Sequence, residues 1–205
     1  MSCAAIIAVK GAATAKRRLA GVLPPATRVR FVATMLEQVL QAAREAYGVA
    51  GIVLVSDGAQ PARPDVVTVL DEAHGLDAAF VAGARAAGAC GYRSAVLLPA
   101  DLPLLEPGDL DGLINSGCEA GVAIACDRAG EGTNALYLPL ELPIALAFGR
   151  GSCARHHAAC VRIGLRPALV CTPGLTLDID EPRDLEVLCD RPAYAFLPRP
   201  ARSVA

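Results

Sequence analysis

The chain has 205 residues, of which 54% are hydrophobic, and its formal net charge at pH 7 is −2. This length suits one domain with a sizeable core, and the charge excludes a strongly basic nucleic-acid-binding surface. No apolar run is long enough for a transmembrane helix, and no basic region precedes an apolar stretch at the N-terminus, so we expect a cytoplasmic protein that binds neither membranes nor nucleic acid.

Short and almost continuous apolar segments predict strands that are buried on both faces. These segments are residues 4–9, 51–55, 66–70, 95–98, 121–125 and 168–171. The segments between them have helical patterns. The predicted helices are residues 28–47, 78–87, 107–114, 151–163 and 181–188. Alternation of strands and helices predicts an α/β sandwich with a mainly parallel sheet.

The C-terminal tail differs from the rest of the chain in composition. Residues 191–205 contain Pro192, Pro198 and Pro200. Such a segment favours an extension that is solvated or loosely docked rather than a folded unit. We therefore predict one domain over residues 1–190 and a Pro-rich extension over residues 191–205.

The eight cysteines contain no C-x-x-C pair, which argues against a zinc site. Several of them lie in apolar, strand-like segments, where a free cysteine packs as a small hydrophobic residue. We expect reduced, mostly structural thiols in a reducing compartment.

A loop with small and basic residues follows the first predicted strand. It runs over residues 10–19 and contains Lys10, Lys16, Arg17 and Arg18. Ligands of open α/β sheets bind at the carboxyl ends of strands, and cationic side chains there could hold triphosphate oxygens. The loop contains neither a Walker sequence nor G-x-G-x-x-G. A solvated surface loop is the alternative.

A single carboxylate follows the predicted strand 95–98. Asp101 stands between Pro99 and Pro103. A charged group directly after a buried strand is costly unless a cation or hydrogen-bond donors accompany it. Asp101 is therefore a candidate Mg²⁺ ligand beneath a nucleotide phosphate, and capping of the following turn is the alternative.

Two further carboxylates stand two residues apart, at Asp178 and Asp180. In an extended segment they project to the same side, where like charges repel unless they share a cation. Asp180 could instead be the N-cap of a helix that starts at Glu181, with Pro182 in its first turn. Capping does not explain Asp178, so a site of three carboxylates with Asp101 is plausible.

Two later segments contain residues suited to anions. Residues 130–136 combine glycines, a hydroxyl and an amide before entering a strand, and residues 148–152 lead into a helix. A helix start offers backbone N–H groups to phosphate or carboxylate, although Ser152 could be a plain N-cap. His156 and His157 follow, and we interpret them as incidental histidines of a surface helix.

Taken in order, these motifs resemble the 2-phospho-L-lactate guanylyltransferases of coenzyme F-420 biosynthesis, a family that includes relatives using phosphoenolpyruvate or 3-phosphoglycerate. The resemblance covers nearly the whole chain up to about Leu188. It rests on Val9-Lys10 with Ala15-Lys16-Arg17-Arg18-Leu19, Leu98-Pro99-Ala100-Asp101-Leu102-Pro103-Leu104, Gly132-Thr133-Asn134-Ala135-Leu136, Phe148-Gly149-Arg150-Gly151-Ser152 with His156, and residues 177–185. Where relatives commonly have Gly-Leu-Asn, this chain has Gly75-Leu76-Asp77.

The resemblance implies a Rossmann-like nucleotidyltransferase fold of the nucleotide-diphospho-sugar transferase type, a three-layer sandwich. It implies that Mg²⁺ is held by Asp101, Asp178 and Asp180. It implies that the nucleotide is contacted by Lys10, Lys16, Arg18, Asp77 and Pro99, with Lys16 and Asp101 as the catalytic residues. It implies that the phosphorylated acid is bound by Thr133, Gly149 and Ser152.

The implied reaction is attack of the substrate phosphate on the α-phosphorus of GTP, with pyrophosphate as the leaving group. A molybdopterin-type cytidylyl- or guanylyltransferase of the same fold is the nearest alternative, and a non-catalytic nucleotide-binding module is an alternative of another class. The oligomeric state stays open, with a homodimer as one option.

Overall fold

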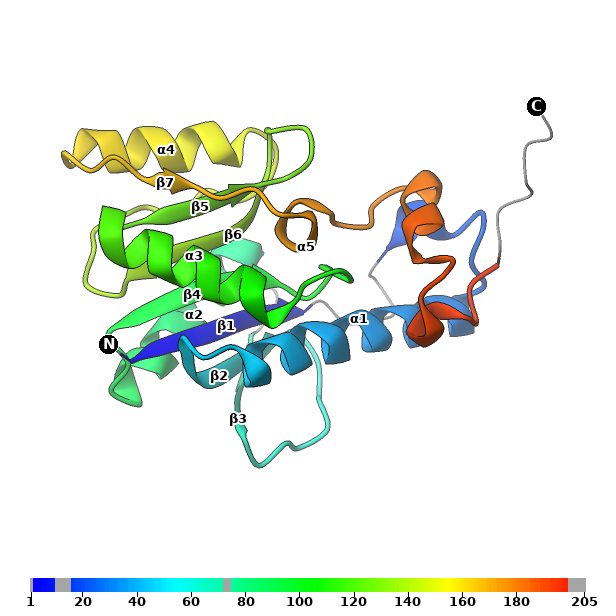
Figure 1. Ribbon diagram of the computed structural model, residues 1–205. Helices are drawn as coiled ribbons and strands as arrows, with labels where there is room; N and C mark the ends of the chain where they lie inside the picture. Colours follow the sequence, from blue (N-terminus) through cyan, green and yellow to red (C-terminus); the bar gives the residue numbers. More distant parts are fainter. Residues whose placement is uncertain (1, 10–15, 72–74, 199–205) are drawn as a thin grey trace.

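The computed structural model describes residues 2–9, 16–71 and 75–198 (Figure 1). Within these ranges, seven strands form one sheet in the order β3-β2-β1-β4-β6-β5-β7. The strands are β1 (Cys3–Val9), β2 (Val49–Ser56), β3 (Val66–Leu70), β4 (Ser94–Pro99), β5 (Ala123–Cys126), β6 (Thr133–Pro139) and β7 (Ala168–Leu169). Only the pairings of β6 with β4 and β5 are antiparallel, which confirms the predicted, mainly parallel sheet.

Helices connect most of the strands, and the predicted helices are found in place. They are α1 (Pro25–Glu45), α2 (Leu76–Ala89), α3 (Pro107–Ala120), α4 (Ser152–Arg162) and the short α5 (Pro173–Thr176). Three 3₁₀ helices complete the described elements, namely η1 (Arg17–Leu19), η2 (Pro182–Leu188) and η3 (Pro192–Tyr194). The last predicted helix is therefore a 3₁₀ helix, and α3 is longer than its apolar pattern predicted. No helix of the described ranges is both long and apolar enough to cross a membrane.

The sheet is covered on both faces, as the residues of β1 show. Cys3, Ala5 and Ile7 belong to the core cluster that includes side chains of α1 and α3. Ala4 and Ile6 belong to the cluster on the opposite face, with side chains of α2 and α4. Because successive side chains of a strand point to opposite faces, a strand between two helical layers must be apolar throughout. The three-layer sandwich is thereby confirmed.

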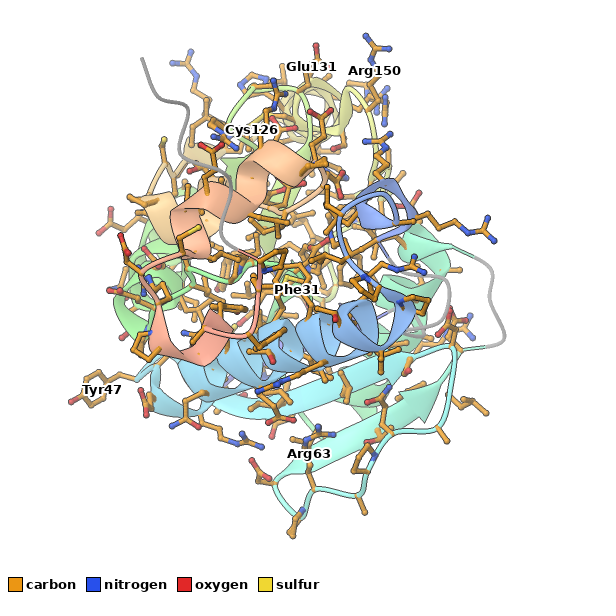
Figure 2. All side chains as sticks on the ribbon, turned by 90° about the vertical axis from the view of Figure 1, so that its right-hand side faces the viewer. Phe31, Tyr47, Arg63, Cys126, Glu131 and Arg150 are labelled. Carbon is orange, nitrogen blue, oxygen red and sulfur yellow. A yellow bond between two sulfur atoms is a disulfide. The ribbon has the colours of Figure 1, made fainter. Side chains whose placement is uncertain are left out.

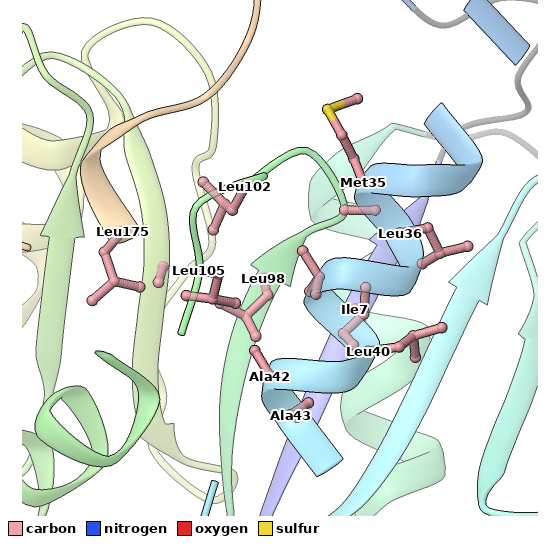
Figure 3. Packing of buried hydrophobic residues seen from close by; sticks show 14 of the residues in the cluster. Ile7, Met35, Leu36, Leu40, Ala42, Ala43, Leu98, Leu102, Leu105 and Leu175 are labelled. Carbon is pink, nitrogen blue, oxygen red and sulfur yellow. The ribbon is translucent and has the colours of Figure 1, made fainter. Parts of the chain in front are cut away.

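The packing of α1 on the sheet fixes the two central strands. Figure 3 shows Met35, Leu36 and Leu40 of α1 packed against Ile7 of β1 and Leu98 of β4. All five side chains are buried, and burial of such a side chain contributes roughly 1.5–3 kcal/mol. The carboxyl ends of β1 and β4 are thus held side by side.

The described part of the C-terminal tail corrects the expectation of a solvated or loosely docked extension. Tyr194 and Leu197 are buried in the core cluster that contains α1. The Tyr194 ring packs edge-on against Phe31 with 5.8 Å between ring centroids, and Arg30 lies 4.1 Å above the ring of Phe196. Figure 2 labels Phe31, a residue of α1, near the centre of the view. The aromatic side chains of the tail pack against α1, and the proline content of the tail did not predict this contact.

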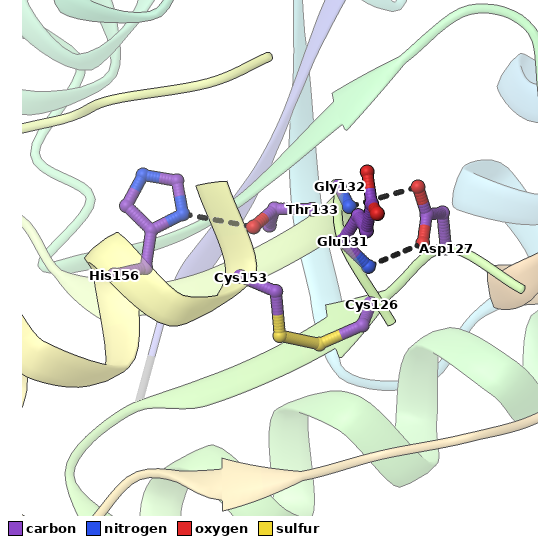
Figure 4. Close-up of a disulfide and its surroundings, with 7 residues drawn as sticks. All are labelled: Cys126, Asp127, Glu131, Gly132, Thr133, Cys153 and His156. Atoms are coloured by element: carbon purple, nitrogen blue, oxygen red, sulfur yellow. Dashed lines mark hydrogen bonds between the residues drawn. A yellow bond between two sulfur atoms is a disulfide. The ribbon is translucent and has the colours of Figure 1, made fainter. Parts of the chain in front are cut away.

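The structure also corrects the expectation that all cysteines are reduced. Cys126 at the end of β5 and Cys153 in the first turn of α4 form a disulfide (Figure 4). The two residues are 27 positions apart, so no short sequence motif links them. Their proximity arises from the packing of α4 beside β5, which periodicity alone does not reveal.

We expect thiol titration of the denatured, non-reduced protein to find six free thiols, because the other cysteines are unpaired in this structure. Reduction before titration should raise the count to eight. A Cys126→Ser/Cys153→Ser variant should give six thiols with and without reduction, and eight thiols in the parent without reduction would contradict the disulfide.

Candidate active site

The central strands create a switch point at the carboxyl edge of the sheet. From β1 the chain passes to β2 and β3 on one side, and then returns to β4 on the other side of β1. The loops that leave β1 and β4 therefore diverge above their shared edge, where open α/β sheets bind ligands. Pro99 is the last residue of β4, and Asp101 and Lys16 belong to these loops. Lys10, a predicted nucleotide contact, lies outside the described residues.

Lys16 brings two of the predicted carboxylates together. Its Nζ lies 2.6 Å from Asp101 Oδ2 and 3.1 Å from Asp180 Oδ1, and the Lys16 side chain is only 7% exposed. Burial alone would lower the pKa of the Lys16 ammonium, but the Asp101 and Asp180 carboxylates outweigh it and raise that pKa. The ammonium is therefore a fixed positive charge at the switch point.

The backbone of Lys16 is in the left-handed region, at φ 54° and ψ 41°. Among the described residues it is the only non-glycine residue with a positive φ. That conformation costs an L-residue about 1–2 kcal/mol, and such strain is concentrated at functional sites. Its two ion pairs stabilise the side chain in this position.

Asp178 completes a cluster of like charges. Burial, followed by the nearby Asp101 and Asp180 carboxylates, raises the pKa of Asp178 above its usual range. Among the described residues, no group of three acidic, cysteine or histidine side chains is arranged as a metal site, and the Lys16 ammonium is the cation between Asp101 and Asp180. The hard oxygens and the excess negative charge nevertheless fit a divalent cation.

The N-caps of α3 and η2 are residues other than the candidate metal ligands. Glu181 is the N-cap of η2, and Asp184 Oδ2 accepts the N–H groups of Glu181 at 2.7 Å and Asp180 at 3.0 Å. The alternative of Asp180 as the cap is therefore wrong. Glu106 caps α3, so Asp101 does not cap that helix.

A pocket of about 440 Å³ joins these carboxylates to the predicted anion-binding segments. One side is formed by Arg18, Leu76, Pro99, Asp101, Asp178 and Asp180. The other side is formed by Asp127, Glu131, Gly132, Thr133, Asn134, Phe148, Gly149 and Arg150. This volume is within the range of small-molecule sites. The structure thus brings Thr133 and Gly149 to the same pocket as the three aspartates.

Two smaller hollows extend along the same edge of the sheet. One, of about 270 Å³, includes Lys16, Pro99, Asp101 and Asp180. The next, of about 210 Å³, lies at the ends of β2 and β3. Leu76 lines both of them and the larger pocket, so the three hollows adjoin one another.

Ser152 occupies a different position from the one expected. It is the first residue of α4, and Gly151 is the N-cap, so the N-cap alternative is wrong. The Ser152 N–H donates to the Gly149 carbonyl at 2.9 Å, and the Cys153 N–H donates to the Glu131 carbonyl at 3.1 Å. Two N–H groups of the helix start are therefore used within the protein. Ser152 Oγ is buried and has no hydrogen-bond partner among the described residues.

Asp77, predicted to contact the nucleotide, makes a hydrogen bond within the protein. Its Oδ1 accepts the N–H of Phe148 at 2.8 Å, which ties the start of α2 to the segment around Gly149. Leu76, beside Asp77, lines all three hollows. The carboxylate thus shapes the pocket wall on the Gly149 side.

His156 is buried rather than incidental. Its Nδ1 lies 2.9 Å from Thr133 Oγ1, and its Nε2 accepts the N–H of Ala147 at 3.0 Å. A sequence signal for this position exists, since Cys153, His156 and Cys160 recur at helical spacing on the buried face of α4. Sequence reasoning missed it because the apolar stripe of this helix is made of cysteine and alanine.

Asp127 is a second residue that sequence reasoning missed. It follows β5 directly, and Asp101 follows β4 after one intervening residue, so a similar strand-end signal was present. Its carboxylate accepts the N–H groups of Glu131 at 2.9 Å and Gly132 at 2.8 Å, as Figure 4 shows. Above this turn, Glu131 pairs with Arg150 at 3.5 Å, and both lie at one end of the molecule in Figure 2.

Comparisons with known proteins identify the family of this chain. The family model described as guanylyl transferase CofC-like matches residues 3–193. The chain is 38% identical to the phosphoenolpyruvate guanylyltransferase of Chloroflexus aggregans, over 91% of this chain and 98% of that protein. It is 35% identical to the 3-phospho-D-glycerate guanylyltransferase of Phenylobacterium zucineum, over 88% of this chain and 86% of that protein.

Solved structures support the fold. A candidate nucleotide-diphospho-sugar transferase from Desulfovibrio desulfuricans G20 superposes with a TM-score of 0.76 at 15% identity, over 95% of this chain and 94% of that chain. The 4-diphosphocytidyl-2C-methyl-D-erythritol synthase of Anaerococcus prevotii gives a TM-score of 0.64 at 12% identity, over 95% of both chains. With the family match over most of its length, the chain belongs to the CofC-like guanylyl transferase family.

Proposed function

We propose that this chain transfers GMP from GTP to a small phosphorylated carboxylic acid and releases pyrophosphate, as a step of coenzyme F-420 biosynthesis. The observation that carries the proposal is the pocket that joins Asp101, Asp178 and Asp180 to Thr133 and Gly149. Relatives named phosphoenolpyruvate and 3-phospho-D-glycerate guanylyltransferases support this class of acceptor.

In the proposed reaction a phosphate oxygen of the acid attacks the α-phosphorus of GTP. A new P–O bond forms, the bond from the α-phosphorus to the bridging oxygen breaks, and pyrophosphate leaves. Because a phosphate dianion is already a nucleophile, no general base is needed. The work of the protein is to position both substrates and to neutralise charge, which can supply most of the reduction in barrier.

On the nucleotide side, Lys16 is the central residue of the proposal. Its ammonium is buried and fixed by two ion pairs, so it offers a positive charge to phosphate oxygens without reorganisation. Arg18 adds a more exposed positive charge, with its Nη1 3.7 Å from Asp180 Oδ2. Pro99 lies at the boundary of two of the hollows. We also assign Lys10 to GTP binding.

We propose Mg²⁺ as the cofactor, held by Asp101, Asp178 and Asp180. When bound, Mg²⁺ supplies charge neutralisation to the triphosphate. The position of the Lys16 ammonium between Asp101 and Asp180 supports a cation-binding role for these carboxylates. Burial of Asp178 beside two like charges supports it as well.

On the acid side, we propose that Thr133 and Gly149 contact the acceptor. Thr133 contributes a hydroxyl group at the start of β6, and Gly149 has a φ of 99°, which favours glycine. Ser152, with its buried and unpartnered Oγ, is assigned to the same subsite behind this wall. We place the enzyme in the cytoplasm. A homodimer stays a prediction that light scattering of the purified protein tests.

The substrates are tested by mixing the protein and Mg²⁺ with each nucleoside triphosphate and a panel of phosphorylated acids. We expect pyrophosphate release only with GTP, and only when 2-phospho-L-lactate, phosphoenolpyruvate or 3-phospho-D-glycerate is present. Turnover of GTP with none of these acids, or a preference for CTP and a pterin acceptor, would overturn the proposal.

We expect Asp178→Asn to reduce kcat by about 100-fold or more, because it removes one carboxylate of the proposed metal site. The variant should unfold at a temperature at least as high as the parent, since burial and the neighbouring Asp101 and Asp180 carboxylates disfavour a charge on Asp178 and raise its pKa. Exposed Asp190→Asn, from the same region, is the control and should keep full activity. An active Asp178→Asn variant contradicts the metal assignment.

We expect Lys16→Gln to lower kcat/KM for GTP by about 100-fold, because a preorganised charge near the reacting phosphates is lost. Arg17→Gln is the matched control, since Arg17 is the exposed neighbour of Lys16. Equal effects of the two substitutions would show that only the net charge of the loop matters.

A further inference from the structure

The hydrogen bonds of His156 define which of its ring nitrogens carries a proton. Nε2 lies 3.0 Å from the backbone nitrogen of Ala147, whose N–H can only donate. Nε2 is therefore an acceptor and bears no hydrogen. An imidazole with one bare nitrogen is neutral, and its single N–H is on Nδ1. Geometry alone thus fixes the tautomer.

The protonation of His156 also determines the direction of its hydrogen bond with the Thr133 hydroxyl. Nδ1 lies 2.9 Å from Thr133 Oγ1, so the Nδ1–H donates and the hydroxyl oxygen accepts (Figure 4). The hydroxyl group has a hydrogen of its own, which must point elsewhere. Within the described residues Thr133 Oγ1 makes no hydrogen bond other than the one to His156, and Thr133 lines the large pocket.

The surroundings of His156 keep it neutral. The side chain is fully buried, and burial, with a smaller contribution from Arg155, lowers the pKa of His156 to about 4 although Asp77 opposes the shift. Asp77 belongs to α2, and Arg155 directly precedes His156 on α4. The Phe148 ring packs edge-on against the imidazole with 4.9 Å between centroids.

We propose that His156 is a positioning residue that turns the Thr133 hydroxyl hydrogen into the pocket, where it donates to an anionic group of the phosphorylated acid. The role in substrate binding rests on the proposed function, whereas the tautomer does not. A histidine that donated from Nε2 would leave Thr133 to donate to the ring and would withdraw this hydrogen from the substrate. The imidazole thus decides whether the pocket presents a donor or only an acceptor.

Two amide substitutions separate this role from simple packing. An asparagine amide can place its N–H near the position of Nδ1, whereas a glutamine amide reaches the position of Nε2. We expect His156→Asn to keep the KM for the acid within about 3-fold, and His156→Gln and Thr133→Val to raise it about 10-fold or more, the effect of one lost hydrogen bond to a charged group. In both His156 variants kcat and the KM for GTP should change by less than about 2-fold.

A double variant tests whether His156 acts through Thr133. If it does, His156→Gln combined with Thr133→Val should raise the KM for the acid no more than Thr133→Val alone, because the coupled hydroxyl is already absent. Exposed His157→Asn, the adjacent histidine on α4, is the control and should leave every constant unchanged. Additive losses, or equal losses for His156→Asn and His156→Gln, overturn the positioning role.

The tautomer is read directly from the parent protein by two-dimensional ¹H–¹⁵N NMR of its histidine rings. We expect His156 to show a protonated Nδ1 and a bare Nε2, with no titration from pH 8 down to about pH 5.5, since its pKa is about 4. A proton on Nε2, or titration near pH 6.5, overturns the inference whether or not the protein is active. If the NMR result holds but the parent turns over no phosphorylated acid, the proposed function fails and the hydrogen-bond assignment stands.

Discussion

The arrangement of the site depends on one buried charge, the ammonium of Lys16 between Asp101 and Asp180. It joins a loop after β1, a loop after β4 and the segment before η2, which are far apart in the sequence. An unpaired lysine with this burial would be costly, and so would three clustered carboxylates without a cation. Each group therefore needs the other, and a left-handed backbone conformation at Lys16 is tolerated as a result.

The rest of the fold holds these groups in register. Side chains of α1 pack on β1 and β4 and keep their carboxyl ends adjacent, while Asp184 binds the backbone of Asp180 from within η2. On the opposite wall, Asp77 and His156 bind successive N–H groups of Phe148 and Ala147. Both walls of the pocket thus contain backbone segments that are held by side chains of η2, α2 and α4, a form of preorganisation that suits a reaction limited by charge and alignment.

The sequence predicted the sheet, most helix positions and the three aspartates, because strand periodicity and strand-end carboxylates are local signals. It failed where the determinant was a contact between distant segments. His156 was missed because alanine and cysteine give α4 a weak apolar stripe, and the Cys126–Cys153 disulfide has no spacing motif. The docked tail at Tyr194 was missed because its prolines favoured an undocked extension, and the hydrogen bond between Asp77 and Phe148 could not be inferred from one strand-to-helix junction.

The proposed reaction transfers the α-phosphoryl group of GTP, with its nucleoside, to a phosphate acceptor, and ³¹P NMR of the reaction mixture tests this transfer most directly. With GTP, Mg²⁺ and phosphoenolpyruvate or 3-phospho-D-glycerate, we expect two mutually coupled signals of a new unsymmetrical diphosphate, together with an equal amount of pyrophosphate. Formation of GDP and a second phosphate on the acid, or of GDP and free phosphate, would mean attack at the γ-phosphorus and would contradict the account.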